Sequence, residues 1–138
     1  MKITNVLVPA KALEATFLDD PQPVAGMPGL YAALNASLSN PQFIYVTGSP
    51  SQLYPFLRSF IDTTYPAGPI LLQNVTLVDV PKVVTLASLD DLLAYKLVMV
   101  DRIQRWYPQK TFLAIGDSTQ RDPETYGTAC VSSFLTWH

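Results

Sequence analysis

The 138-residue sequence is poor in several features that particular protein classes require. Its one cysteine, Cys130, excludes a disulfide within the chain and a cysteine-based metal site. Only 14% of residues are charged, and the nine basic residues are scattered singly, which argues against nucleic-acid binding. No apolar run approaches the roughly 20 residues that span a bilayer, and the start of the chain lacks the apolar core of a secretory signal. We therefore expect an intracellular protein, cytoplasmic or peripheral to membranes.

The sequence is rich in hydrophobic residues, which make up 49% of it, and in prolines, of which there are 12. This composition is typical of a packed globular domain, and the length predicts one domain over residues 1–138. Residues 1–28 contain prolines at 21, 23 and 28 around Gly26, which predicts a loop-rich lead-in. Residues 29–138 alternate between helix-like and strand-like patterns.

Short apolar runs bounded by proline or glycine predict buried strands at 43–47, 70–72 and 112–116. Apolar residues at helical spacing predict helices after Pro28, from Pro50, over about 89–106 and from Pro123. Strands that alternate with helices predict an α/β fold, with a parallel sheet covered by helices on both faces. Ligands bind such sheets beyond the carboxyl ends of the strands.

For two of the predicted helices, the sequence also indicates the capping residues and the buried face. Ser49 is expected to cap the helix that Pro50 opens, and Ser88 with Asp91 resembles a capping box before the long helix. The buried face of the first is expected to contain Leu53, Phe56, Leu57, Phe60 and Ile61. The buried face of the long helix is expected to contain Leu92, Leu93, Tyr95, Met99, Val100 and Ile103.

Three groups of residues carry chemistry. Asp117 and Asp122 lie five positions apart after a predicted strand, Thr47 ends another strand, and Lys96 lies within the apolar face of the long helix. Each also has a purely structural explanation, since Asp122 can cap the helix before Pro123, Thr47 can be an ordinary strand-end threonine, and Lys96 can extend its charge to water. Taken together they fit phosphoryl chemistry, because Asp117 suits Mg²⁺ while Lys96 and Thr47 suit phosphoryl oxygens.

The order of these residues resembles that of motifs two, three and four of the haloacid dehalogenase superfamily. The segments YVTGSPSQLYPFL (45–57), GPILL (68–72) and GDSTQRDPETY (116–126) further resemble the catalytic domain of the actin-patch-associated phosphatidate phosphatases. Gly26-Met27-Pro28 followed by Leu30-Tyr31 also matches that family's lead-in. The likeness covers nearly the whole chain.

This resemblance implies Mg²⁺-dependent conversion of phosphatidate to diacylglycerol through an aspartyl-phosphate, on a haloacid-dehalogenase-like fold. By position, Thr47 would bind the phosphoryl group with Gly48 and Ser49, and Lys96 would neutralise the charged intermediate. Asp117 would ligate Mg²⁺, and Asp122 would orient the metal shell or Lys96. Ser118 adds another hydroxyl nearby. Membrane contact is expected to come from regions outside this sequence.

The expected nucleophile motif, Asp-x-Asp-x-Thr at the end of an apolar strand, is not found in the sequence. In the family it would directly precede a segment like Lys2–Leu7, whereas this chain starts at Met1, and Asp19-Asp20 has the wrong spacing and is interpreted as loop. We therefore expect an incomplete sheet: a fragment, a mispredicted gene model or a degenerate copy. The chain alone is expected to show no turnover.

Two other functions compete with this interpretation. A serine esterase would use Gly116-Asp117-Ser118 with Ser118 as nucleophile, but the one histidine, His138, is terminal, and Leu135 stands where its aspartate partner should be. Thr47 to Ser51 also departs from the Gly-x-Ser-x-Gly elbow of hydrolases. A non-catalytic module that binds phosphate or lipid phosphate is the stronger alternative, because it needs no nucleophile.

Overall fold

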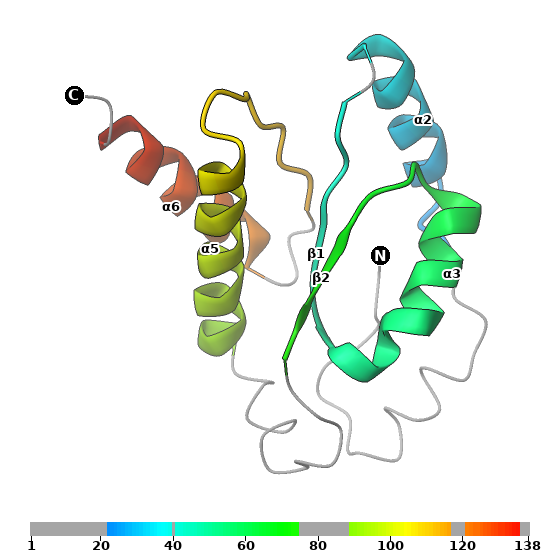
Figure 1. Ribbon diagram of the computed structural model, residues 1–138, viewed down its shortest axis with the longest axis horizontal. Helices are drawn as coiled ribbons and strands as arrows, with labels where there is room; N and C mark the ends of the chain where they lie inside the picture. The colour runs from blue at the N-terminus through cyan, green and yellow to red at the C-terminus, as the bar shows by residue number, and fades with distance from the viewer. Residues whose placement is uncertain (1–21, 40, 75–88, 117–120, 136–138) are drawn as a thin grey trace. The chain divides into compact units, whose positions relative to one another are not determined.

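The computed structural model describes residues 22–39, 41–74, 89–116 and 121–135, which form helices and a small parallel sheet (Figure 1). The chain divides into two compact units, Met1–Val84 and Thr85–His138. The described part confirms the mixed α/β class. None of its helices is long and apolar enough to cross a membrane.

The first unit opens with helix α2, Met27–Ser37. Gly26 adopts a φ of 82°, which glycine tolerates because it lacks a Cβ, and Pro28 occupies the first turn, where its missing N–H is harmless. The helix predicted after Pro28 is therefore confirmed. Its apolar face is not buried, since Leu30 is 46% exposed and Leu38 is 49% exposed.

Two predicted strands form the sheet of the first unit. Strand β1, Tyr45–Pro50, lies parallel to strand β2, Ile70–Gln73, as expected of strands joined by a helix. Tyr45 pairs with Ile70 and Thr47 with Leu72, after which the register becomes irregular up to Pro50. The irregularity therefore falls on the segment that carries Thr47, Gly48 and Ser49.

The connection between the strands consists of the 3₁₀ helix η1, Ser51–Leu53, and helix α3, Tyr54–Thr64. Leu57, Phe60 and Ile61 of α3 are buried together with Ile70 of β2. Partly buried side chains complete this core: Tyr45, Leu53, Phe56, Tyr65 and Leu72. The apolar stripe expected on this helix is confirmed, because one face of α3 supplies most of the core.

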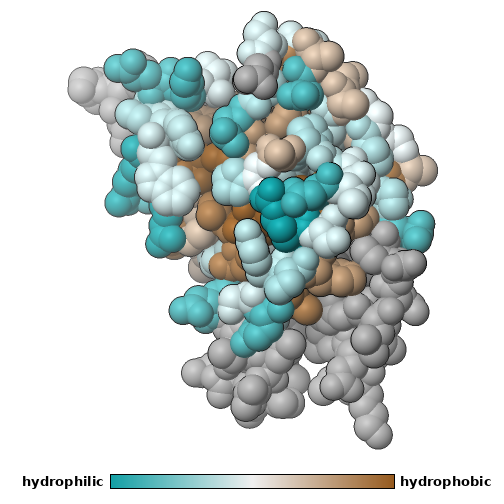
Figure 2. Space-filling model, turned by 45° about the vertical axis from the view of Figure 1, so that its right-hand side comes forward, coloured by the Kyte–Doolittle hydropathy of each residue, from teal (hydrophilic) through white to brown (hydrophobic). Residues whose placement is uncertain are grey.

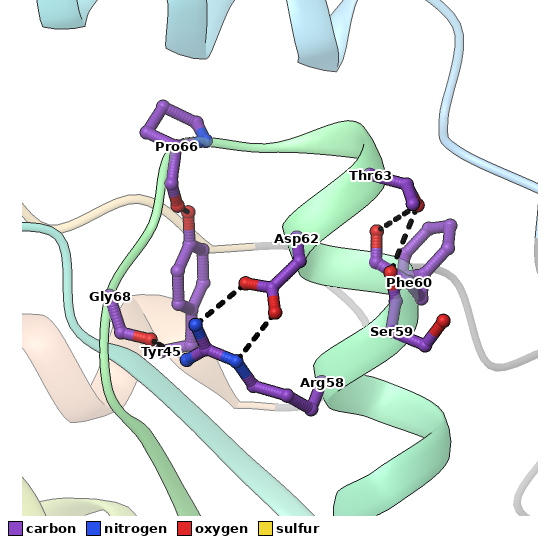
Figure 3. Close-up of polar contacts among 8 residues, drawn as sticks. All are labelled: Tyr45, Arg58, Ser59, Phe60, Asp62, Thr63, Pro66 and Gly68. Carbon is purple, nitrogen blue, oxygen red and sulfur yellow. Dashed lines mark hydrogen bonds and ion pairs between the residues drawn. The ribbon is translucent and has the colours of Figure 1, made fainter.

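Polar contacts fix the turn between α3 and β2 (Figure 3). The guanidinium of Arg58 donates from Nε to Asp62 at 2.7 Å and from a terminal nitrogen to the carbonyl of Gly68 at 3.1 Å. The hydroxyl of Tyr45 donates to the carbonyl of Pro66 at 2.6 Å. Together these bonds join β1 and α3 to the 66–68 turn, so that β2 starts in register with β1.

The second unit contains two described helices that pack on each other, α5, Leu89–Trp106, and α6, Asp122–Leu135. The bounds of α5 match the prediction, and its buried side includes Met99 and Ile103, as expected. Ser88, the predicted cap, lies outside the described residues. Helix α6 begins at Asp122, next to Pro123, which confirms the last predicted helix.

The prediction of a strand at 112–116 is wrong. Residues 111–116 are irregular, with Phe112 45% exposed and Leu113 65% exposed. An apolar run becomes a strand only when another strand pairs with it, and the described part of the second unit contains none. Large hydrophobic side chains are also exposed elsewhere in the described residues, and one face of the molecule shows hydrophobic residues among hydrophilic ones (Figure 2).

Candidate functional site

The first part of the candidate site is the end of β1. The hydroxyls of Thr47 and Ser49 are hydrogen-bonded at 2.9 Å, and the backbone N–H of Ser49 donates to Thr47 Oγ1 at 3.2 Å. Ser49 is only 6% exposed. Thr47 and Ser49 are two residues apart in β1, and residues two apart in a strand lie on the same face, so the strand itself places these two hydroxyls together.

The expectation that Ser49 caps the following helix is wrong. Ser49 lies within β1, and neither η1 nor α3 has a side-chain cap. Pro50 precedes η1 instead of starting α3, which takes Pro55 into its first turn. Because its hydroxyl is bonded to Thr47, Ser49 belongs with the polar group predicted to bind phosphate.

The second part of the candidate site is a buried ion pair between the two helices of the second unit. Lys96 of α5 is 6% exposed, Asp122 at the start of α6 is 8% exposed, and the ammonium of Lys96 donates to the carboxylate of Asp122. The alternative that Lys96 extends its charge to water is therefore wrong. Buried charges require a partner, and Asp122 supplies it.

Gly116 leaves space for the carboxylate of Asp122. A Cβ on Gly116 would lie 2.3 Å from Asp122 Oδ2, closer than atoms can approach. Gly116 ends the apolar run at 112–116 in the sequence, and the structure shows that its missing Cβ leaves room for the side chain of Asp122. Tyr126 supports the same segment, because its hydroxyl donates to the carbonyl of Ile115 at 3.3 Å.

Tyr95, next to Lys96 in α5, has a buried hydroxyl with no hydrogen-bond partner among the described residues. Burial raises the pKa of Tyr95 to about 12, and nearby Arg102 offsets part of that rise. The phenol therefore stays neutral at physiological pH, and Lys96 supplies the positive charge on this part of the helix.

The remaining predicted site residues, Asp117 and Ser118, lie outside the described residues, as does His138 of the esterase hypothesis. Within the described ranges, no group of three or more histidine, cysteine, aspartate or glutamate side chains could hold a metal ion. Asp122, the second predicted metal ligand, is directed at Lys96. This contact agrees with the role of orienting Lys96, which was one of its two predicted roles.

Two residues near the ion pair had no role predicted from the sequence. Thr125 is 0% exposed and bonds to the carbonyl of Arg121, while Arg121 adopts a left-handed backbone with a φ of 60°. No spacing pattern indicates a left-handed arginine. The one sequence signal was their position beside the Asp122-Pro123 helix start.

Comparisons with known proteins show what the chain as a whole is similar to. Residues 1–134 match the family model described as phosphatidate phosphatase APP1, catalytic domain. The phosphatidate phosphatase APP1 of Saccharomyces cerevisiae is 28% identical over 108 residues, which cover 78% of this chain and 17% of the yeast protein. The chain thus spans a small part of that curated relative's length. No solved structure matches it.

Proposed function

This chain belongs to the family of the phosphatidate phosphatase APP1 catalytic domain, and from that membership we propose that it carries the phosphate-binding part of a phosphatidate phosphatase site. The observation that supports this most directly is the buried Lys96, whose ammonium is held by Asp122 between two helices. A family match alone would leave the chemistry open. A lysine kept out of water at the predicted position supports a defined role for its charge.

In the proposed binding mode, each of the predicted residues has its own role. Thr47, with Ser49 and the backbone at Gly48, donates hydrogen bonds to phosphoryl oxygens, and Lys96 neutralises their negative charge. Asp122 keeps Lys96 extended toward α6 and limits its freedom. The proposed substrate is phosphatidate or a related lipid phosphate, and the proposed fold is a three-layer, haloacid-dehalogenase-like parallel sheet, of which the described residues show two strands.

Mg²⁺ is the proposed cofactor. Asp117 would hold it, and a divalent cation there would stabilise negative charge on the phosphoryl oxygens. Asp122 can contribute to the metal shell only through the carboxylate that also receives Lys96.

The 138 residues contain no Asp-x-Asp-x-Thr motif, so we propose that this chain alone binds phosphate without hydrolysing it. The proposal thus combines membership of the family with the alternative of a non-catalytic module that binds phosphate or lipid phosphate. In an intact family member the reaction would be Mg²⁺-dependent hydrolysis of phosphatidate through an aspartyl-phosphate. An intracellular location with peripheral membrane contact is part of the same proposal.

The test combines binding and turnover on the purified chain. Isothermal titration with inorganic phosphate and with short-chain phosphatidate, with and without Mg²⁺, measures binding, and phosphate release from phosphatidate in detergent micelles measures hydrolysis. We expect binding that is lost in Lys96→Met, and no phosphate release. Phosphate release that Asp117→Asn abolishes would instead show that the chain is an active phosphatase. If the chain binds neither inorganic phosphate nor phosphatidate, the proposed phosphate-binding function is refuted.

A further inference from the structure

Arg121, the residue before α6, has a backbone conformation that L-residues rarely adopt. Its φ of 60° lies in the left-handed region, where glycine is favoured and arginine is not. Such residues persist only where the surroundings hold them, and they gather at functional sites. The next residue is Asp122, whose carboxylate binds Lys96.

Thr125 holds the backbone of Arg121 from within α6. Its N–H donates to the carbonyl of Arg121 at 2.9 Å, and its hydroxyl donates to the same oxygen at 2.9 Å. Thr125 is 0% exposed, so water does not compete for these bonds. The left-handed residue is therefore fixed to the helix that begins immediately after it.

The side chain of Arg121 adds contacts to both helices. One terminal nitrogen lies 3.4 Å from a carboxylate oxygen of Asp90, in the first turn of α5, and Nε lies 3.3 Å from a carboxylate oxygen of Glu124. Asp90 is 83% exposed and Glu124 is 53% exposed, so these ion pairs are weak. The backbone conformation, more than the side chain, sets the geometry.

We propose that Arg121 is a positioning residue: its left-handed backbone, fixed by Thr125, sets the carboxylate of Asp122 against Lys96. The torsion at Arg121 determines the direction in which the chain enters α6. Asp122 has little room to adapt, because Gly116 lies against its other oxygen. The consequence for phosphate binding rests on the proposed function, since Lys96 is the cation that meets the phosphoryl group.

Lysine side-chain NMR tests this geometry without requiring activity. The chain has five lysines, so Lys96→Met identifies the Lys96 ε-methylene signal by its loss, and Asp122→Asn gives its position when the ion pair is broken. Arg121→Val, whose β-branched side chain strains a left-handed backbone more than arginine does, is compared with Arg121→Gly, which tolerates it. Thr125→Val removes one of the two bonds at nearly constant volume.

We expect the Lys96 signal of Arg121→Val to move toward its position in Asp122→Asn, while Arg121→Gly keeps the wild-type position. Inorganic phosphate should bind Arg121→Val about tenfold more weakly and Arg121→Gly within about twofold of wild type. If Arg121→Val does not fold, Thr125→Val replaces it, with a smaller movement in the same direction. A Lys96 signal unmoved in the folded variant overturns the proposal. A wild-type chain that fails to bind phosphate refutes the proposed function, while the Lys96 signal still decides the positioning role.

Discussion

At the scale of single residues, the buried charges carry most of the information about function. The ammonium of Lys96 is buried against the carboxylate of Asp122, and such a pair repays the loss of hydration only if both partners remain. Arg105, also on α5, pairs with Asp101 four residues away, but their side chains are 78% and 54% exposed. The two lysine and arginine ion pairs of α5 thus differ in burial, and a direct comparison separates their contributions to stability.

Lys96→Met should lower the free energy of unfolding by about 3 kcal/mol, because it leaves the Asp122 carboxylate buried without its cation. Adding Asp122→Asn should restore part of the loss, since no charge then remains buried. Arg105→Met, the exposed control on α5, should cost less than about 1 kcal/mol. Urea unfolding measures all four proteins. Equal costs for Lys96→Met and Arg105→Met would contradict the buried pair.

The raised pKa of Tyr45 predicts how the free energy of unfolding changes at alkaline pH. Burial, together with the neighbouring phenols of Tyr31 and Tyr65, raises the pKa of Tyr45 from 10.0 to about 12. The unfolded chain therefore releases this proton first. The contribution of Tyr45 to stability is fully present below pH 10 and is lost as the pH rises from 10 to about 12.

Tyr45→Phe should cost about 1 kcal/mol near neutral pH, because the carbonyl of Pro66 loses its donor. Above pH 10 the wild type should lose stability faster than the variant, so the difference between them should shrink. Urea midpoints measured from pH 8 to 11.5 test this. Parallel pH profiles for the two proteins would contradict a raised pKa at Tyr45.

At the scale of elements, the contact between α5 and α6 depends on small residues as well as on charges. Gly116→Ala should destabilise the second unit by at least about 1 kcal/mol, because its Cβ cannot coexist with the present position of Asp122. Gly127→Ala is the matched control, since Gly127 lies within α6 and a Cβ there would meet nothing within 4 Å. It should stabilise the helix by roughly 0.5–1 kcal/mol.

Thermal unfolding of the two alanine variants, followed by circular dichroism, gives the comparison. Lysine NMR adds a second measurement, because Gly116→Ala should also displace Asp122 and move the Lys96 signal, whereas Gly127→Ala should not. If the two variants had similar stabilities, the close approach of Gly116 to Asp122 would be excluded.

At the scale of the whole molecule, the residues proposed to bind phosphate belong to two compact units. Thr47 and Ser49 belong to Met1–Val84, and Lys96 and Asp122 belong to Thr85–His138. Each pair has its own hydrogen bonds within its unit. Variants of each pair therefore test separately whether that pair binds phosphate.

Phosphate with Mg²⁺ should therefore raise the melting temperature of the wild-type chain. At a concentration ten times the Kd, the expected stabilisation is about 1.4 kcal/mol, or a few degrees. Thr47→Val and Lys96→Met should each reduce the effect, and Arg105→Met, the exposed control on α5, should retain it. A shift that survives in Thr47→Val would restrict the phosphate site to the second unit.

The family resemblance, the bounds of α5, the stripe on α3 and the presence of a parallel sheet could all be predicted from the sequence. These features depend on periodicity, on proline and glycine at element ends, and on motif order, which are local properties of the chain. Lys96 and Asp122 could be named from sequence for the same reason. The sequence could not decide between a lysine in water and a lysine in a buried ion pair.

Only the tertiary structure decided the contacts that join distant residues. It paired Lys96 with Asp122, bonded Ser49 to Thr47 instead of to a helix end, and placed Arg121 in a left-handed conformation. It also left residues 112–116 without a strand, because a strand requires a hydrogen-bonding partner that no local pattern can supply. Local composition fixes which elements can form, and packing between segments far apart in the chain fixes what their side chains do.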